Sequence, residues 1–306
     1  MYQTNPQQTA APLPDQVGDY RVESLIGEGA AATVYRARRM VAPSTTAAGD
    51  ATPVVALKVL KPDATKQPHI LACFQFEGRV LSRLDHPGIL RVYATGMDDD
   101  RLYTAMELVD GVSLDNVLLA NKRLTTPQAI DIARQLAAAL GYLHGHGYVH
   151  RDIKPANLML TPDGRVVLFD FGTVVRIKDG APYEAGLYGT PAFLAPEQTV
   201  AGGKIDGRAD LYAAGIMLYM MASGRKPFYG SRSEVLDAHV RSAPPRPSKF
   251  APISPALEAV ILKAIAKDPA DRFQSGEEFA DALAQVPAQD SPTLGDRLFG
   301  WLRFGR

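Results

Sequence analysis

The chain has 306 residues, and its 33 lysines and arginines balance 33 aspartates and glutamates. This balance excludes a strong overall field that would attract nucleic acid. The apolar runs fall short of the roughly 20 residues that span a bilayer, so we expect no transmembrane segment. Cys73 is the sole cysteine, which excludes an internal disulfide and suits a reducing cytosol. We expect Cys73 to be a buried, inert thiol.

The first part of the chain predicts a tail followed by a β-hairpin. Residues 1–18 are rich in glutamine, proline, threonine and alanine and lack the features of a signal peptide, so we expect a disordered tail. Two strand-like segments, 20–26 and 33–38, flank the sequence Gly27-Glu28-Gly29. The composition of residues 40–53 then predicts a long flexible loop inserted before the next strand.

The next strand and the helix expected after it each contain a charged residue of interest, Lys58 and Glu77. Residues 55–60 are apolar except for Lys58, and a lysine in such a strand is costly unless it contacts an anion. Glu77 lies in a segment with helical periodicity that stops at residues 85–87. The alternatives are a lysine that reaches solvent and a glutamate on a solvated helix face.

The most informative residues lie between positions 150 and 172. His150-Arg151-Asp152 begins a string that ends at Asn157, and Asp170-Phe171-Gly172 follows after a short interval. Phosphoryl transfer requires a carboxylate near the attacking hydroxyl group and oxygen ligands that hold Mg²⁺ against the triphosphate. Asp152, Asn157 and Asp170 supply these groups, so the pattern indicates phosphoryl-transfer chemistry.

These two motifs together resemble the signature of the protein kinase family, in the serine/threonine form that is common in bacteria. The resemblance covers about residues 20–286. It implies an α+β, two-lobed fold, with a kinase domain over residues 19–286. A small β-rich N-lobe with one helix would cover about residues 19–107, and a larger, mainly helical C-lobe about residues 111–286.

The resemblance also implies a role for each candidate residue. Asp152 would orient the substrate hydroxyl group and accept its proton, while Asn157 and Asp170 would hold Mg²⁺, or Mn²⁺ in its place, on ATP. Lys58 would contact the α- and β-phosphates and pair with Glu77. The glycine-rich loop, the hinge and the walls of the adenine pocket would supply the other nucleotide contacts, namely Gly27, Glu28, Gly29, Val34, Ala56, Met106, Glu107, Val109 and Met159.

Some positions bear on phosphate contact and acceptor choice. Ala32 stands where the family has its third glycine, so we expect altered phosphate contact rather than loss of binding. Lys154 and Thr190 match the serine/threonine branch, in which the lysine meets the γ-phosphate and the threonine bridges Asp152 and Lys154. Ala156 gives no indication of a preference for arginine near the acceptor.

Three further segments carry expectations of their own. Glu197, in the sequence Ala-Pro-Glu, is expected to form a buried ion pair with Arg272, and the uncharged run after Asp210 predicts a helix buried on all sides. Residues 174–188 contain no serine or threonine, although Arg151 usually accompanies a phosphorylated loop residue. We therefore hypothesise that a carboxylate, Asp179 or Glu184, meets Arg151, or that a partner or self-association orders this loop.

Residues 287–306 form a C-terminal tail with four apolar residues at helical spacing and three arginines. This pattern is typical of a short amphipathic segment that contacts a membrane or a partner; the alternative is that it packs back on the kinase domain. The location expected for the whole chain is cytoplasmic, with peripheral membrane contact through this tail as the further option.

The resemblance implies a serine/threonine protein kinase that transfers the γ-phosphate of Mg-ATP to protein hydroxyl groups, including its own, in signal transduction. The hydroxyl groups of residues 40–53 are candidate autophosphorylation sites. The alternative is a nucleotide-binding pseudokinase that acts as a scaffold, which usually lacks one of the residues Lys58, Asp152 and Asp170. A small-molecule kinase of related fold is disfavoured by Thr190 and the Ala-Pro-Glu segment.

Overall fold

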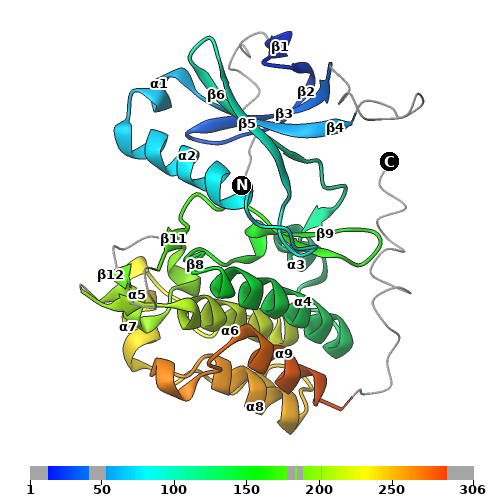
Figure 1. Cartoon of the computed structure of the whole chain (residues 1–306). Coiled ribbons are helices and arrows are strands. Elements are labelled where there is room, and N and C mark those ends of the chain that lie inside the picture. The colour runs from blue at the N-terminus through cyan, green and yellow to red at the C-terminus, as the bar shows by residue number, and fades with distance from the viewer. Residues whose placement is uncertain (1–12, 41–52, 178–182, 185–188, 201, 288–306) are drawn as a thin grey trace. The chain divides into compact units, whose positions relative to one another are not determined.

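The computed structural model describes residues 13–40, 53–177, 183–184, 189–200 and 202–287. The chain divides into two compact units (Figure 1). The first unit comprises Met1–Asp85 with Leu90–Val109, and the second comprises His86–Ile89 with Asp110–Arg306. The first unit contains a β-sheet with two helices and the second is mainly helical, which confirms the expected α+β class.

The first unit contains an antiparallel six-stranded sheet in the order β1-β2-β3-β4-β6-β5. Its inner face is apolar because alternate residues of neighbouring strands, such as Val55, Leu57 and Ala105, are buried in one cluster. The strands are β1 (Gln16–Val17), β2 (Tyr20–Glu28), β3 (Ala32–Arg39), β4 (Val54–Leu60), β5 (Val92–Asp98) and β6 (Arg101–Glu107). Strand β1 lies within the predicted tail, so ordered structure begins earlier than expected.

Two helices, α1 (Pro62–Thr65) and α2 (Pro68–Leu81), belong to the same unit. Gly78 lets α2 approach the sheet, because a Cβ atom at this position would lie 2.8 Å from Thr95 Cγ2. The prediction that Cys73 is buried is wrong, since its side chain is exposed. Ile70 and Leu71 pack partly buried against the core, and Phe74 is buried in the same cluster, whereas Cys73 lies off this side of α2, so the apolar character of the segment did not determine its burial.

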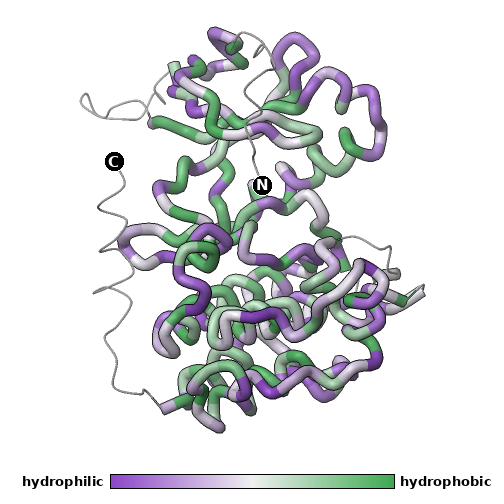
Figure 2. The backbone as a smooth tube through the Cα atoms, turned by 180° about the vertical axis from the view of Figure 1, so that it is seen from behind, coloured by the Kyte–Doolittle hydropathy of each residue, from purple (hydrophilic) through white to green (hydrophobic). Residues whose placement is uncertain are grey.

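The second unit is built around α6, which is buried along almost its whole length, as its lack of charge predicts. Asp206 caps the start of α6, and Gly224 ends it in the left-handed conformation that favours glycine. Hydrophobic and hydrophilic residues alternate along other helices of this unit, as expected for helices with one buried face (Figure 2). The helices are α3 (Leu114–Asn121), α4 (Thr126–Gly145), α5 (Pro196–Thr199), α6 (Gly207–Ser223), α7 (Arg232–Arg241), α8 (Pro255–Ala264) and α9 (Gly276–Ala284).

Short strands and 3₁₀ turns lie in the connections between the helices of the second unit. One small sheet joins β7 (Val112–Ser113), β9 (Leu158–Leu160) and β10 (Val166–Leu168). Two further pairs join β8 (Tyr148–Val149) with β11 (Val175–Arg176), and β12 (Tyr183–Glu184) with β13 (Lys204–Ile205). The 3₁₀ turns are η1 (Pro155–Asn157), η2 (Pro191–Phe193), η3 (Pro247–Lys249) and η4 (Pro269–Asp271).

Several expectations fall on segments that the structure does not describe. These segments include residues 1–12, 41–52 of the predicted insertion and 288–306 of the C-terminal tail. Among the helices that the structure does describe, none is long and apolar enough to cross a membrane.

Candidate active site

The first unit pairs Lys58 with Glu77, as predicted. Lys58 Nζ on β4 lies 2.9 Å from Oε1 and 2.7 Å from Oε2 of Glu77 on α2. The side chains are 21% and 9% exposed, so the pair is largely shielded from water. An ammonium group that is shielded from water and positioned by a carboxylate is suited to binding a phosphate oxygen.

Cross-strand register brings three further predicted nucleotide contacts to the same face of the sheet as Lys58. Val34 is directly opposite Lys58, and Met106 is directly opposite Ala56, two residues before Lys58 on β4. Because residues two apart on a strand share a face, these side chains form an apolar surface beside the charged pair. This combination suits a flat, apolar ring that carries phosphates.

The turn between β2 and β3 corresponds to the predicted glycine-rich loop. Gly29 N–H donates to Ala32 O at 2.8 Å, so the turn spans only residues 29–31. Ala32 is buried at the start of β3, where its methyl group packs with Leu60. The carboxylate of Glu28 lies 2.6 Å from Lys61 Nζ, which is an ion-pair contact that the sequence did not indicate.

Two predicted contacts, Glu107 and Val109, lie where the first unit ends. Glu107 is the last residue of β6, and its backbone N–H donates to Arg91 O at 2.9 Å. Met159 belongs to β9 of the second unit, so it is described with that unit.

The second unit gathers the predicted catalytic residues around the carboxylate of Asp152. Lys154 Nζ lies 2.5 Å from Oδ2, and the backbone N–H and Oγ1 of Thr190 both donate to Oδ1 at 3.0 Å. Asn157 Nδ2 donates to Asp152 O at 2.9 Å. Thr190 and Lys154 therefore contact different oxygens of Asp152. A direct contact of the Thr190 hydroxyl group with Lys154 stays a prediction.

The two predicted metal ligands are brought together by the backbone. Phe169 N–H donates to Asn157 O at 3.0 Å, which places Asp170 beside Asn157 in the fold. Asp170 is exposed and has a φ of 63°, an uncommon conformation for a residue other than glycine. An amide oxygen and a carboxylate fit Mg²⁺, which is usually bound by one or two protein groups together with phosphate oxygens and water.

Comparison with known proteins agrees with this geometry. Residues 20–285 match the model of the protein kinase domain. The chain belongs to the protein kinase family. The kinase domain is 39% identical over 274 residues to the serine/threonine-protein kinase PknJ of Mycobacterium tuberculosis, covering 87% of this chain and 45% of that protein.

Two other relatives are similar to a comparable degree. The serine/threonine-protein kinase pkn3 of Myxococcus xanthus is 38% identical over 282 residues, which cover 87% of this chain and 50% of the relative. A probable serine/threonine-protein kinase of Streptomyces coelicolor is 38% identical over 270 residues, which cover 85% and 39%. The chain therefore spans half or less of the length of these relatives.

Asp210 of the kinase domain holds the backbone of the loop that contains Asp152, a role that the sequence did not indicate. Its carboxylate accepts from the backbone N–H groups of His150 and Arg151, both at 2.8 Å, and lies 2.9 Å from His144 Nε2. Burial alone would raise the pKa of Asp210, but the hydrogen bond and charge of His144 hold that pKa below its ordinary value. The only signal in the sequence was a charged residue at the start of a helix that carries no charge beyond that residue.

The hydrogen bond to Asp210 holds Arg151 in an uncommon backbone conformation. Arg151 has a φ of 70°, and its Nε donates to Thr173 O at 2.7 Å. Burial lowers the pKa of His150, whose ring packs edge-on against Phe171 with centroids 4.7 Å apart. His150 therefore packs beside Asp152, whose backbone N–H donates to His150 Nδ1 at 3.4 Å.

The hypothesis that a carboxylate meets Arg151 falls outside the part of the chain that the structure describes. Asp179 lies in the segment 178–182, and only the backbone of Glu184 is described. The pairing of Arg151 with either carboxylate stays a prediction.

The predicted ion pair between Glu197 and Arg272 is confirmed. Both guanidinium nitrogens lie 2.7 Å from the carboxylate oxygens, and the Arg272 side chain is 0% exposed. Arg272 also donates to the backbone carbonyls of Ala266 and Lys267. The end of the segment that contains Thr190 is thereby anchored in the core of the kinase domain.

Replacement of Asp210 by alanine is expected to destabilise the fold by about 2–5 kcal/mol, because buried donors that lose their acceptor cost roughly 1–3 kcal/mol each. Urea unfolding followed by circular dichroism measures the change. Asp281→Ala, on the exposed side of α9, is the control and is expected to change stability by less than about 0.5 kcal/mol. An Asp210→Ala protein as stable as the control would contradict the supporting role.

Proposed function

We propose that the chain is a serine/threonine protein kinase that transfers the γ-phosphate of Mg-ATP to hydroxyl groups of proteins, including its own. The observation that carries the proposal is the Asp152 carboxylate, held by Thr190 and Lys154 beside Asn157. The relatives described above are named as serine/threonine-protein kinases, which supports the same class of acceptor.

The residues would divide the work as follows. Asp152 orients the acceptor hydroxyl group and takes its proton. Lys154 stabilises the negative charge on the phosphoryl group during its transfer. Asn157 and Asp170 would hold Mg²⁺, or Mn²⁺ in its place. Mg-ATP supplies the phosphoryl group and the metal charge that neutralises it, so most of the rate enhancement comes from positioning.

In the first unit, Lys58 would bind the α- and β-phosphates while Glu77 keeps the ammonium group in place. The apolar face formed by Val34, Ala56 and Met106 would contact the adenine ring, together with Met159. The backbone of Gly27, Glu28 and Gly29 would approach the phosphates, and that of Glu107 and Val109 the adenine edge.

The proposal extends to location and partners. Protein substrates with serine or threonine acceptors are the expected partners, in the cytoplasm and without nucleic acid. The single cysteine and the balanced charge support this setting. Self-association for activation, and contact of residues 287–306 with a membrane or a partner, belong to the same proposal and await a test.

The experiment that tests the function is transfer of labelled γ-phosphate from Mg-ATP to a generic protein acceptor and to the chain itself. Lys58→Met and Asp170→Asn are the inactivating variants. Lys66→Met and Asp237→Asn are matched controls. Both residues are exposed, and the two substitutions remove the same kinds of charge at positions outside the proposed site. Label on serine and threonine in the controls, and its absence from the inactivating variants, is the expected result.

A measurement of nucleotide binding distinguishes an active kinase from the alternative, a nucleotide-binding scaffold. A chain that binds Mg-ATP in a calorimetric titration but transfers no label, with or without phosphatase pretreatment, would be a nucleotide-binding scaffold. Label that appears on tyrosine instead would contradict the assignment of Lys154 and Thr190.

A further inference from the structure

A buried histidine on α7 has no part in the proposed mechanism. His239 is 0% exposed, and its ring packs edge-on against Phe228 with the centroids 5.0 Å apart. Tyr212 Oη on α6 lies 2.8 Å from His239 Nδ1. Lys267 Nζ, in the connection that follows α8, donates to the backbone oxygen of His239 at 2.7 Å. Three separate parts of the second unit therefore hold this residue in one position.

The contact with Tyr212 determines which nitrogen of the ring carries the proton. Burial and the positive charge of Lys267 lower the pKa of His239 to about 4, so at neutral pH the ring has a single N–H group. Burial raises the pKa of Tyr212, so its hydroxyl group keeps its proton. Among the described residues, this hydroxyl group has no hydrogen-bond partner other than His239 Nδ1. The hydroxyl group therefore donates to Nδ1, and the N–H group of the ring is at Nε2.

The Nε2 atom of His239 is buried and has no hydrogen-bond partner in the described part of the chain. Burial has the largest effect on the ring and lowers its pKa, but the backbone of Ala192 and Pro191 in η2 has the opposite effect. A backbone group that raises the pKa of a histidine is an acceptor oxygen close to the ring. Buried donors nearly always have an acceptor in native proteins. The Nε2–H group therefore has backbone oxygens of η2 beside it, but not in the geometry of a hydrogen bond.

The turn η2 connects His239 to the candidate active site. It begins directly after Thr190, whose backbone N–H and Oγ1 both donate to Asp152 Oδ1 at 3.0 Å. Thr190, Pro191 and Ala192 are each partly exposed, so this segment lies between solvent and the buried ring. An acceptor whose hydroxyl group meets Asp152 therefore lies beside the exposed side of η2.

We propose that His239 is a positioning residue for protein substrates. An acceptor peptide that contacts the exposed side of η2 moves this turn onto the ring, where Nε2–H donates to one of its backbone oxygens. The new hydrogen bond fixes Thr190 against Asp152. A ligand shifts a protein towards the state that it binds better, so this hydrogen bond strengthens peptide binding and leaves nucleotide binding unchanged. The proposal rests on the proposed function, because it assigns a step of substrate binding to the same site.

Nitrogen NMR of the full wild-type chain tests the position of the proton without any substitution. The nitrogen shifts of a neutral histidine distinguish its two tautomers, and the chain has six histidines. The signals of His239 are those that are absent from the spectrum of His239→Gln. The expected result at neutral pH is a neutral ring with its proton at Nε2. A proton at Nδ1, or a charged ring, would overturn the proposal whether or not the chain is active.

Steady-state transfer of labelled γ-phosphate to a degenerate peptide mixture with a fixed central threonine tests the effect on substrate binding. The amide group of His239→Asn ends near the position of Nδ1, whereas that of His239→Gln reaches the position of Nε2. Tyr212→Phe removes the hydroxyl group that directs the proton to Nε2 and keeps the shape of the side chain. His69→Gln, at the exposed start of α2, is the matched control.

His239→Asn and Tyr212→Phe are each expected to raise the KM for the peptide mixture about three- to tenfold, the effect of one lost hydrogen bond. Their kcat and their KM for ATP are expected to stay within about twofold of the wild-type values. His239→Gln is expected to recover most of the peptide KM, because its amide group can donate where Nε2 does. The control is expected to match the wild type, and thermal unfolding of each variant verifies that it is folded.

The outcomes separate failure of this proposal from failure of the proposed function. An active chain whose peptide KM is the same in all variants would overturn the proposal alone. Equal increases in His239→Asn and His239→Gln, with no change in Tyr212→Phe, would show that the ring only fills space. A wild-type chain that transfers no label to any acceptor would overturn the proposed function, and this proposal with it.

Discussion

Asp152→Asn is expected to lower the rate of phosphoryl transfer by about 10²–10⁴-fold, the usual contribution of a positioned general base. The amide keeps the shape of the side chain and can accept from Thr190, but it cannot take the proton of the acceptor hydroxyl group. It also loses the charge that holds Lys154 Nζ at 2.5 Å. Nucleotide affinity is expected to stay within a few-fold of the wild-type value, because the proposed phosphate and metal contacts come from other residues.

Single-turnover transfer of labelled phosphate and calorimetric titration with Mg-ATP measure the two effects separately. Asp237→Asn is the matched control, since it removes the same charge from an exposed ion pair on α7, and it should keep full activity. If Asp152→Asn retained half of the wild-type rate, Asp152 would not be the proton acceptor. If it lost nucleotide affinity as well, its role would lie in nucleotide binding.

Glu197→Gln and Arg272→Met are each expected to destabilise the kinase domain by about 3–5 kcal/mol, because each leaves an uncompensated charge in the core. Arg272 is the more severe case, since its side chain is fully buried and its guanidinium group lies 4.7 Å from the Tyr212 ring centroid. Urea unfolding monitored by circular dichroism gives the free energy of unfolding of each variant.

The double variant Glu197→Gln/Arg272→Met provides an internal check. It removes both charges, so its loss of stability is expected to be smaller than the sum of the two single losses. Arg241→Met, in an exposed i,i+4 pair with Asp237, is the control and should cost less than about 1 kcal/mol. Additive losses in the double variant, or a single loss below about 1 kcal/mol, would show that the pair does not act as a buried unit.

The parts of the site that could be predicted are those written as short motifs. Lys58 and Glu77 pair as expected because the family resemblance assigns a helix carboxylate to the lysine of this strand. Asp152, Lys154 and Thr190 meet as expected because the motifs define their mutual position. The buried helix α6 was predictable because its sequence contains no charge after its first turn.

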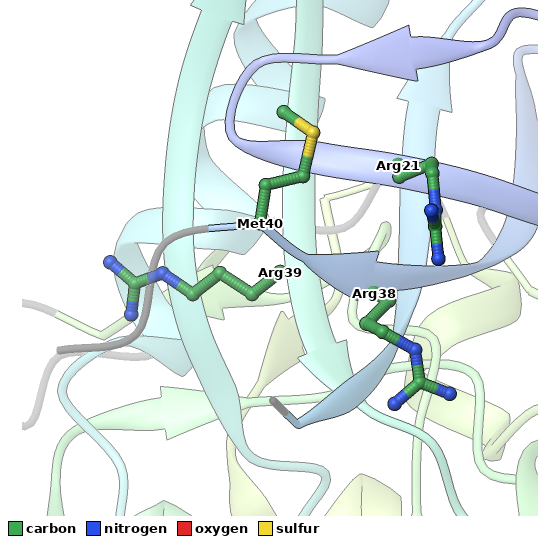
Figure 3. A pocket seen from close by; sticks show the side chains of 4 residues that line it. All are labelled: Arg21, Arg38, Arg39 and Met40. Carbon is green, nitrogen blue, oxygen red and sulfur yellow. The ribbon is translucent and has the colours of Figure 1, made fainter. Parts of the chain in front are cut away.

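The remaining features depend on contacts that no local pattern records. Asp210 accepts from backbone groups 59 and 60 residues earlier in the chain, and this contact exists only after α6 packs beneath the loop. Cys73 shows a different limit, since the apolar character of a segment does not determine which of its residues lie on the buried side of the helix. The position of Arg21 opposite Arg38 likewise depends on the register of β2 and β3 (Figure 3).

The long separation between Glu197 and Arg272 determines when the second unit can be completed during synthesis. The two residues are 75 positions apart, so Glu197 leaves the ribosome well before its only cationic partner in the buried pair. The six-stranded sheet of the first unit contains no residue beyond position 107 and can close earlier. Because domains form progressively from the N-terminus on the ribosome, a nascent chain arrested before residue 272 should hold a folded first unit and an incomplete second one. A protease should then cleave the arrested chain selectively after residue 110.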